Sequence, residues 1–250
     1  STYYICNNAL SQCDKLTKLT IPDSVLTIGY SAFAQCDNLD SIYIPDNVIK
    51  INGNLFYQCP KLSFVSFGEN LTQLPGYLFY ECTGLKTVQT GNRLKSIGNR
   101  TFLKCTSLSS FVVPDSVTTI DQYAFGECKS LSSITFGKSV KTIGEYAFSS
   151  CSSLKLLTLP DSVTQIGSSA FANCSSLTSL DFGSSLSSIP NGAFAGCSGL
   201  TTVNFSTAIT SIGDFAFGSC AGLTSVTIPD QILQIGKGAF NRCPGMTHFT

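Results

Sequence analysis

The sequence predicts an α/β repeat solenoid, mostly β, and three observations lead to this fold class. First, cysteine recurs every 23 residues from Cys13 to Cys243 without a slip, and a strict period of this length is typical of a solenoid. Second, apolar and polar residues alternate after each cysteine, as they do in a half-buried strand. Third, a phenylalanine, usually preceded by alanine, recurs three residues before each cysteine from Cys36 to Cys243. Stacked units would bury these phenylalanines together, because one unit is too small to close its own core.

The first element expected in each unit is a strand beginning about five residues after the cysteine. The positions six and eight residues after the cysteine are apolar in nearly every unit, with Thr90 as an exception. Proline or glycine follows, as at Pro22 and Gly68, and ends the strand. Aspartate follows proline in five units and is expected to fix the turn. Stacking should pair these strands in parallel, about 4.8 Å apart, as a concave sheet.

Two further elements complete the expected unit. A second apolar pair, such as Val25 and Ile28, predicts another short strand. The segment from the alanine to the cysteine is too short for a stable helix, so one helical turn is expected there. The phenylalanines should then stack as an inner spine, from Phe33 to Phe240.

Composition excludes several classes of function. Hydrophobic residues make up 43% of the chain and charged residues 12%, which is typical of a packed protein. Fifteen basic and fifteen acidic residues cancel, which argues against a nucleic-acid partner. No apolar run approaches the roughly 18 residues of a membrane span, so no membrane insertion is expected from this segment. The single histidine, His248, lies near the end of the sequence, and neither a nucleophilic triad nor a nucleotide-binding glycine motif is present. We therefore expect no enzyme, no cofactor and no metal.

Eleven of the twelve cysteines occupy one phase of the repeat. No C-x-x-C spacing suggests a zinc site. The favoured interpretation is a column of buried free thiols that act as small hydrophobic side chains. Occasional bridging between neighbouring units is the alternative. Cys6 lies outside the column and either pairs with Cys13 or is an exposed free thiol.

The unbroken period predicts one domain, residues 1–250, of about eleven units that are partial at both ends. Ile5 already matches the second apolar pair of the unit, and Thr250 falls within an expected strand. Solenoids normally need polar capping units, and neither end shows one. We expect that the sequence is a fragment of a longer protein or, alternatively, that its ends meet a partner.

The repeated pattern C-x-x-L-x-x-[IVLF]-x-[IF]-[PG]-x-x-[VIL]-x-x-I-G-x-x-A-F-x-x-C resembles the BspA-like, or treponemal-type, leucine-rich repeats. The resemblance covers essentially the whole chain, with modest departures such as Thr101 for alanine and Met246 for leucine. It implies a curved right-handed leucine-rich-repeat solenoid. It also implies a cell-surface or secreted protein of oral bacteria, treponemes or parasitic protists that adheres to host matrix or to other cells. The family has no fixed site residue that maps onto this sequence.

Residues that vary between units are the candidates for partner binding. The outward strand positions, five and seven residues after each cysteine, are mostly serine and threonine. The departures chosen as candidates are Tyr43, Phe64, Gln89, Val112, Leu156, Asp181 and Asn204. Exposed apolar side chains on a sheet can anchor a protein partner. The alternative is that they are scattered surface hydrophobes.

Two other surfaces are candidates for binding a partner. Tyrosines share phases in Tyr57/Tyr80 and in Tyr123/Tyr146, where they either contact protein or carbohydrate or shield the turn. Residues 86–155 hold nine basic and four acidic residues. This band either attracts anionic glycans or acidic protein, or is solvated surface charge.

The function expected from the whole sequence is a non-enzymatic protein-binding and adhesion module. Its expected partner is a host matrix or cell-surface protein, with a glycan as a second partner class. An intracellular scaffold that docks along other proteins is the alternative function. Flanking sequence with a signal peptide or an anchor would favour the surface protein.

Overall fold

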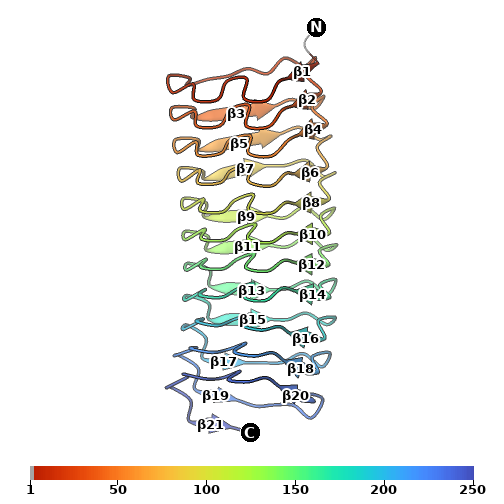
Figure 1. The fold of residues 1–250 in the computed structure, drawn as a ribbon. Helices are drawn as coiled ribbons and strands as arrows, with labels where there is room; N and C mark the ends of the chain where they lie inside the picture. Colours follow the sequence, from red (N-terminus) through yellow and green to blue (C-terminus); the bar gives the residue numbers. More distant parts are fainter. Residues whose placement is uncertain (1–2) are drawn as a thin grey trace.

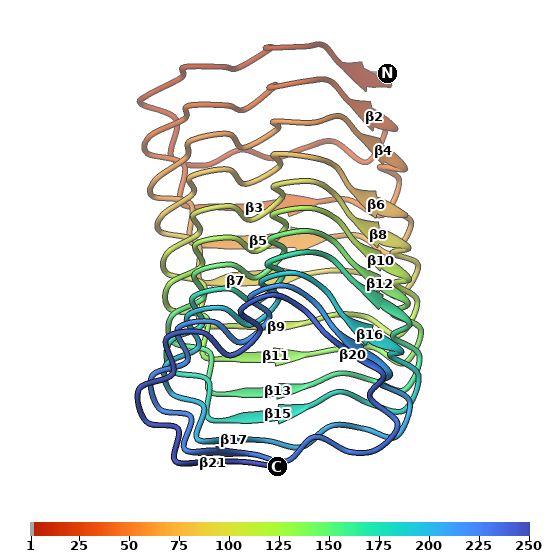
Figure 2. The same ribbon diagram turned by 60° about the horizontal axis from the view of Figure 1, so that its bottom comes forward.

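The computed structural model describes residues 3–250 as a stack of similar coils, each one repeat unit long (Figure 1). Two columns of short strands follow the stack from the N-terminal to the C-terminal end. A second view, tilted toward the axis of the stack, shows the coils as loops around a common interior (Figure 2). Every strand pairing is parallel and joins residues 23 apart, as in Ile42 with Val65. The predicted repeat solenoid is confirmed, because the sequence period and the structural period are the same.

The main strand column contains the strand expected after each cysteine. Lys18 begins it through a single parallel bridge to Ser41. Its members are β3 (Ser41–Ile44), β5 (Phe64–Phe67), β7 (Thr87–Gln89), β9 (Ser110–Val112), β11 (Ser133–Thr135), β13 (Leu156–Thr158), β15 (Ser179–Asp181), β17 (Thr202–Val203), β19 (Ser225–Val226) and β21 (His248–Phe249). In β3 the burial alternates as expected, with Ile42 and Ile44 buried and Tyr43 exposed.

The second strand column contains the predicted second short strand. Its members are β1 (Tyr4–Ile5), β2 (Thr27–Ile28), β4 (Lys50–Ile51), β6 (Gln73–Leu74), β8 (Ser96–Ile97), β10 (Thr119–Ile120), β12 (Thr142–Ile143), β14 (Gln165–Ile166), β16 (Ser188–Ile189), β18 (Ser211–Ile212) and β20 (Gln234–Ile235). Ile5 pairs with Ile28, which confirms that the first residues already follow the repeat phase.

The second strand column is interrupted twice, between β4 and β6 and between β14 and β16. In an intact part of the column, the Gly98 N–H donates to the Leu74 carbonyl of the preceding coil at 2.8 Å. Pro75 and Pro190 occupy this phase at the two interruptions. Proline has no N–H to donate. Each interruption therefore follows from one residue.

The prediction of one helical turn per unit is wrong, because residues 3–250 contain no helix. Between the alanine and the cysteine the backbone instead makes turns that bond to the next coil. The Phe56 N–H donates to the Leu78 carbonyl at 2.9 Å, and the Gln58 N–H donates to the Tyr80 carbonyl at 2.8 Å. Backbone donors used between coils are not free for a helical bond within the coil. The unit is thus a β-solenoid coil without its expected helical part. The absence of any helix also means that residues 3–250 contain no helix able to cross a membrane.

Two residues in each coil adopt a left-handed backbone conformation, one immediately before the cysteine and one five residues before it. Examples are Gln58 with φ of 56° and Asn54 with φ of 60°. The same two phases hold glycine in one coil, at Gly192 and Gly196. Because an α-helix needs negative φ at every residue, these two positions exclude a helix in each coil.

The core is a column of apolar side chains running the length of the stack. The phenylalanine spine forms as predicted, with adjacent ring centroids 4.8 Å apart for Phe102 and Phe125 and 5.8 Å apart for Phe33 and Phe56. Ring pairs at these separations add to the energy of burial. Thr101, which replaces the usual alanine, is fully buried and donates to the Gly98 carbonyl at 2.7 Å, so it is accommodated without an unpaired hydroxyl.

The cysteine column is buried as predicted at nine positions, and Cys13 and Cys243 are half-buried near the two ends. Each buried thiol lies within hydrogen-bonding distance of a carbonyl of the preceding coil, as Cys82 does with Phe56 at 2.9 Å. All twelve cysteines are free, including exposed Cys6. The cysteine thus acts as a small core residue that also donates to the neighbouring coil.

Three of the five aspartates after proline, Asp46, Asp115 and Asp161, bond to the next coil and not within their own turn. The Asp46 carboxylate accepts from the Glu69 N–H at 3.0 Å, and the Asp161 carboxylate accepts from the Ser184 N–H at 2.9 Å. At these positions the carboxylate bonds to backbone one full unit ahead, and not to the turn that it was expected to fix. These contacts link the coils along the edge of the main strand column.

Candidate functional site

The outer face of the main strand column carries the seven residues predicted to bind a partner. Three of the four large side chains among them are well exposed: Tyr43 at 54%, Val112 at 69% and Leu156 at 62%. Phe64 is half-buried, while the remaining three predicted residues, Gln89, Asp181 and Asn204, are exposed. Large apolar side chains therefore project from a surface that otherwise holds mainly serine and threonine.

Tyr43 and Phe64 line a common shallow hollow of about 290 Å³. The parallel register places Ser41 beside Phe64 and Tyr43 beside Ser66, so the two aromatic residues are diagonal neighbours on adjacent strands. Lys18 also lines the hollow and adds a positive charge at its edge. One partner surface can therefore cover both rings.

The other predicted residues lie in different places along the face. Gln89 and Val112 line a second hollow of about 590 Å³. Leu156 lines a third, of about 690 Å³. Asp181 and Asn204 line none of these three hollows, and the Asp181 carboxylate accepts from the Gly183 N–H at 3.0 Å in its own turn. The seven residues thus share one face without forming one pocket.

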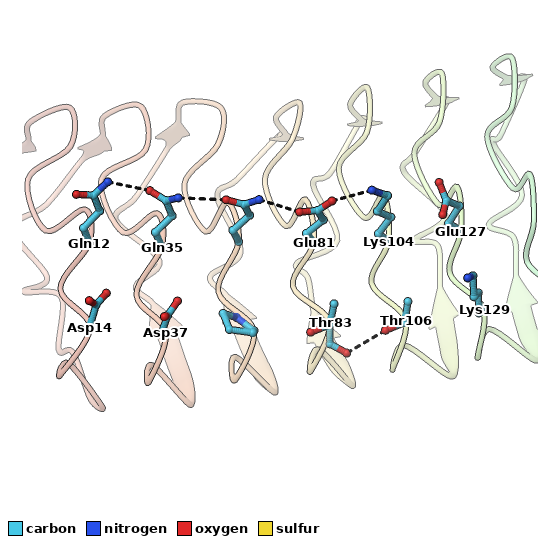
Figure 3. A pocket seen from close by; sticks show the side chains of 12 residues that line it. Gln12, Asp14, Gln35, Asp37, Glu81, Thr83, Lys104, Thr106, Glu127 and Lys129 are labelled. Carbon is cyan, nitrogen blue, oxygen red and sulfur yellow. Dashed lines mark hydrogen bonds and ion pairs between the residues drawn. The ribbon is translucent and has the colours of Figure 1, made fainter.

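A polar groove on another side of the solenoid was not predicted (Figure 3). It has a volume of about 690 Å³ and is lined by two rows of side chains from six successive coils. One row comes from the position before each cysteine and the other from the position after it. The lining residues are Gln12, Asp14, Gln35, Asp37, Gln58, Pro60, Glu81, Thr83, Lys104, Thr106, Glu127 and Lys129. The recurrence of glutamine at one phase in the first three coils was the signal that could have revealed it.

The upper row of this groove is a chain of side-chain hydrogen bonds between coils (Figure 3). Gln12 donates to Gln35 at 3.1 Å, Gln35 donates to Gln58 at 3.1 Å, and Gln58 donates to Glu81 at 2.8 Å. Lys104 donates to the other Glu81 oxygen at 2.7 Å. Hydrogen bonds from Lys104 and from Gln58 hold the pKa of Glu81 below its usual value. The polar groups of this row therefore bond to one another, and the main effect of the row is to link successive coils.

The predicted tyrosine rows are stacked against one another. The rings of Tyr57 and Tyr80 are 5.0 Å apart and those of Tyr123 and Tyr146 are 4.7 Å apart. Arg100 lies over the Tyr123 ring at 4.8 Å, and it also donates to the hydroxyl of Tyr77 at 3.0 Å. These contacts favour the interpretation that the rows shield the turn.

Members of the basic band are also engaged within the protein. Lys104 pairs with Glu81, and Arg93 donates to the Asn70 side chain at 2.8 Å. No group of three or more histidine, cysteine, aspartate or glutamate side chains in residues 3–250 is arranged to hold a metal ion. His248 lies exposed on β21, beside the Thr247 hydroxyl. The arrangement of these side chains supports binding chemistry at the surfaces described above.

The family model described as "BspA type Leucine rich repeat region" matches residues 3–132 and 118–247, in six copies. None of the curated proteins matches the chain.

Two solved structures are informative. A leucine rich cell surface protein from Faecalibacterium prausnitzii is 30% identical, with a TM-score of 0.61, over 99% of this chain and 76% of that one. The leucine-rich repeat protein of Treponema pallidum is 26% identical, with a TM-score of 0.56, over 83% of this chain and 84% of that one. Both comparisons extend over most of the solenoid.

Proposed function

Because this chain belongs to the BspA-type leucine-rich repeat family, we propose that it is a non-enzymatic binding module of a cell-surface or secreted protein. Its partner is a host matrix or cell-surface protein that lies across the outer face of the main strand column. Repeat solenoids of this kind offer long, regular surfaces for protein contacts. The similarity to a cell surface protein of Faecalibacterium prausnitzii supports the location.

The observation that carries the proposal is the exposure of large apolar side chains on the strand face. Tyr43, Val112 and Leu156 each expose more than half of their surface, although the fold has no need of them there. The backbone beneath them is held by parallel pairing, so little conformational entropy is lost when a partner binds. Aromatic and apolar anchors on a rigid surface commonly carry most of the energy of an interface.

The test removes the pair of aromatic anchors that share one hollow. The double change Tyr43→Ser and Phe64→Ser should weaken binding to a purified matrix or cell-surface protein about 30-fold, which corresponds to roughly 2 kcal/mol. Partners would first be found by screening wild-type protein against a panel of such purified proteins with surface plasmon resonance. The thermal midpoint should stay close to that of wild type, because both changes preserve the inward residues.

The matched control is the double change Leu26→Ser and Leu233→Ser. These two side chains are also exposed, at 40% and 85%, but they precede strands of the second column. The control should bind like wild type. Unaltered affinity of the Tyr43 and Phe64 variant for every partner found would show that the strand face is ordinary surface.

A further inference from the structure

A hollow on the second strand column lies where the ladder between β4 and β6 is interrupted. Its volume is about 710 Å³, within the range of about 300–1,000 Å³ typical of small-molecule sites. The residues that line it are Tyr30, Ile49, Lys50, Ile51, Asn52, Gly53, Asn54, Leu71, Thr72, Gln73, Pro75, Gly76 and Tyr77. The hollow is separate from both the main strand face and the groove of Figure 3.

Two adjacent glycines open the hollow. Gly53 and Gly76 occupy the phase six residues before the cysteine, and neither has a positive φ. The same phase holds a side chain in the coils on both sides, Tyr30 before them and Asn99 after them. A Cβ atom on Gly53 would lie only 2.9 Å from the Gly76 carbonyl oxygen, so glycine lets the two coils approach closely at this point. With no side chain at either position, the surface between Tyr30 and Asn99 stays open.

An exposed aromatic ring stands beside this space. Tyr30 is 54% exposed, and a Cβ atom built on Gly53 would lie 3.7 Å from its ring. Ile49, which is 57% exposed, adds a second apolar contact. The ring and the glycine surface together make a flat apolar platform at the edge of the hollow.

The polar groups around the platform are mostly neutral and can both donate and accept. Asn52, Asn54 and Gln73 supply three amide side chains, and Lys50 is the charged member of the lining. The interruption at Pro75 supplies one more acceptor. Pro75 has no N–H to donate to the Ile51 carbonyl, whereas the Gly98 N–H donates to the equivalent Leu74 carbonyl one coil later.

From this combination we infer that the hollow binds a neutral carbohydrate. A pyranose ring presents an apolar face of C–H groups, which stacks on an aromatic ring, and a rim of hydroxyls that donate and accept. Tyr30 and the glycine surface take the ring face. The amides of Asn52, Asn54 and Gln73 and the carbonyl of Ile51 take the hydroxyls.

The experiment uses the whole chain and a printed array of neutral oligosaccharides, followed by titration calorimetry with the glycans retained. Tyr30→Ala should weaken binding at least tenfold, because it removes the stacking surface. Gly76→Asn should do the same by filling the hollow with the residue that the neighbouring coil holds at Asn99. A Cβ atom at Gly76 would meet the Asn99 carbonyl at 3.1 Å, so the backbone must adjust only slightly.

Tyr4→Ala is the matched control, because Tyr4 is also an exposed tyrosine, at 45%, but lies on β1 and outside the lining of the hollow. It should leave glycan affinity within twofold of wild type, and circular dichroism should show the same melting for all three variants. An array on which no neutral glycan is retained would overturn the inference. Glycan binding that is unchanged in both Tyr30→Ala and Gly76→Asn would also overturn it. Binding of peptides in the hollow, with no glycan bound, would overturn it as well. Because Tyr43 and Phe64 take no part, the protein-binding proposal stands or fails independently.

Discussion

Two residues of each coil hold the backbone at positive φ, and most of them are not glycine. For an L-residue this conformation costs roughly 1–2 kcal/mol. The coil keeps it because both residues place their N–H groups toward the next coil, as Tyr77 and Glu81 do at 2.9 Å each. Local strain is therefore offset by hydrogen bonds between coils.

This balance predicts how one residue responds to substitution. Ser150 has φ of 61°, and glycine adopts that conformation without strain. Ser150→Gly should leave the free energy of unfolding equal or slightly higher, whereas Ser150→Val should lower it by roughly 1–2 kcal/mol. Urea denaturation followed by circular dichroism measures both. If valine and glycine give the same midpoint, the left-handed conformation does not limit stability at this corner.

At the scale of the element, the cysteine column responds to pH. Burial raises the pKa of the Cys36 thiol to about 11 and that of the Cys220 thiol to about 12, from an ordinary value of 9.0. Above pH 9 an unfolded chain loses these protons while the folded chain keeps them, so deprotonation favours unfolding. The contribution is fully present below about pH 9 and is lost as the pH rises through the folded values.

The expected outcome is a fall in the urea midpoint between pH 8 and pH 11 that is smaller in Cys220→Ala than in wild type. All other ionisable groups are common to both proteins and cancel in the comparison. An equal fall of the urea midpoint in both proteins would mean that burial does not keep the Cys220 thiol protonated.

In the native state at pH 8, an alkylating reagent should modify exposed Cys6 rapidly, whereas the nine buried cysteines should react only in denaturant.

The elements also show which parts of the fold a sequence can predict. The main strand follows from alternation of apolar residues, as in Ile42 and Ile44, because each inward position must be apolar in every coil. The second short strand was predicted from an apolar pair three residues apart, such as Val25 and Ile28. The false helical turn arose because the left-handed positions hold residues such as Tyr77, Arg100 and Lys104, which give no local signal of positive φ. Asn8, Asn54, Gly192 and Gly196 at the same phases were the available hint.

Predicting surfaces was harder than predicting strands. The outward direction of Tyr43 and Val112 follows from strand alternation alone. The hollow beside Tyr30 depends on two glycines and one proline from different coils, and its shape appears only when the coils are stacked. The ladder from Gln12 to Glu81 likewise joins residues 23 apart, which a local reading of the sequence does not connect.

For the whole molecule, stability comes from contacts between neighbouring coils. Because every strand pairing joins residues 23 apart, a whole unit can be removed while the phase of all others is kept. Deletion of residues 129–151 should give a folded protein with a single cooperative transition at a lower temperature. Deletion of residues 129–139 shifts every later side chain out of phase and should give an unfolded or aggregated product. Circular dichroism and size-exclusion chromatography distinguish the two, and similar behaviour of both deletions would contradict nearest-neighbour stacking.

The amides of the ladder in Figure 3 all point the same way along the solenoid. Each glutamine donates to the next coil, and Gln35 and Gln58 also accept from the preceding one, so turning one amide around would require turning all three. An ionised carboxylate can only accept, and Glu81 therefore sets the orientation of amides as far away as Gln12. A single negative charge thus aligns a row of dipoles across three coils, and Glu81→Lys would reverse their arrangement without moving the backbone.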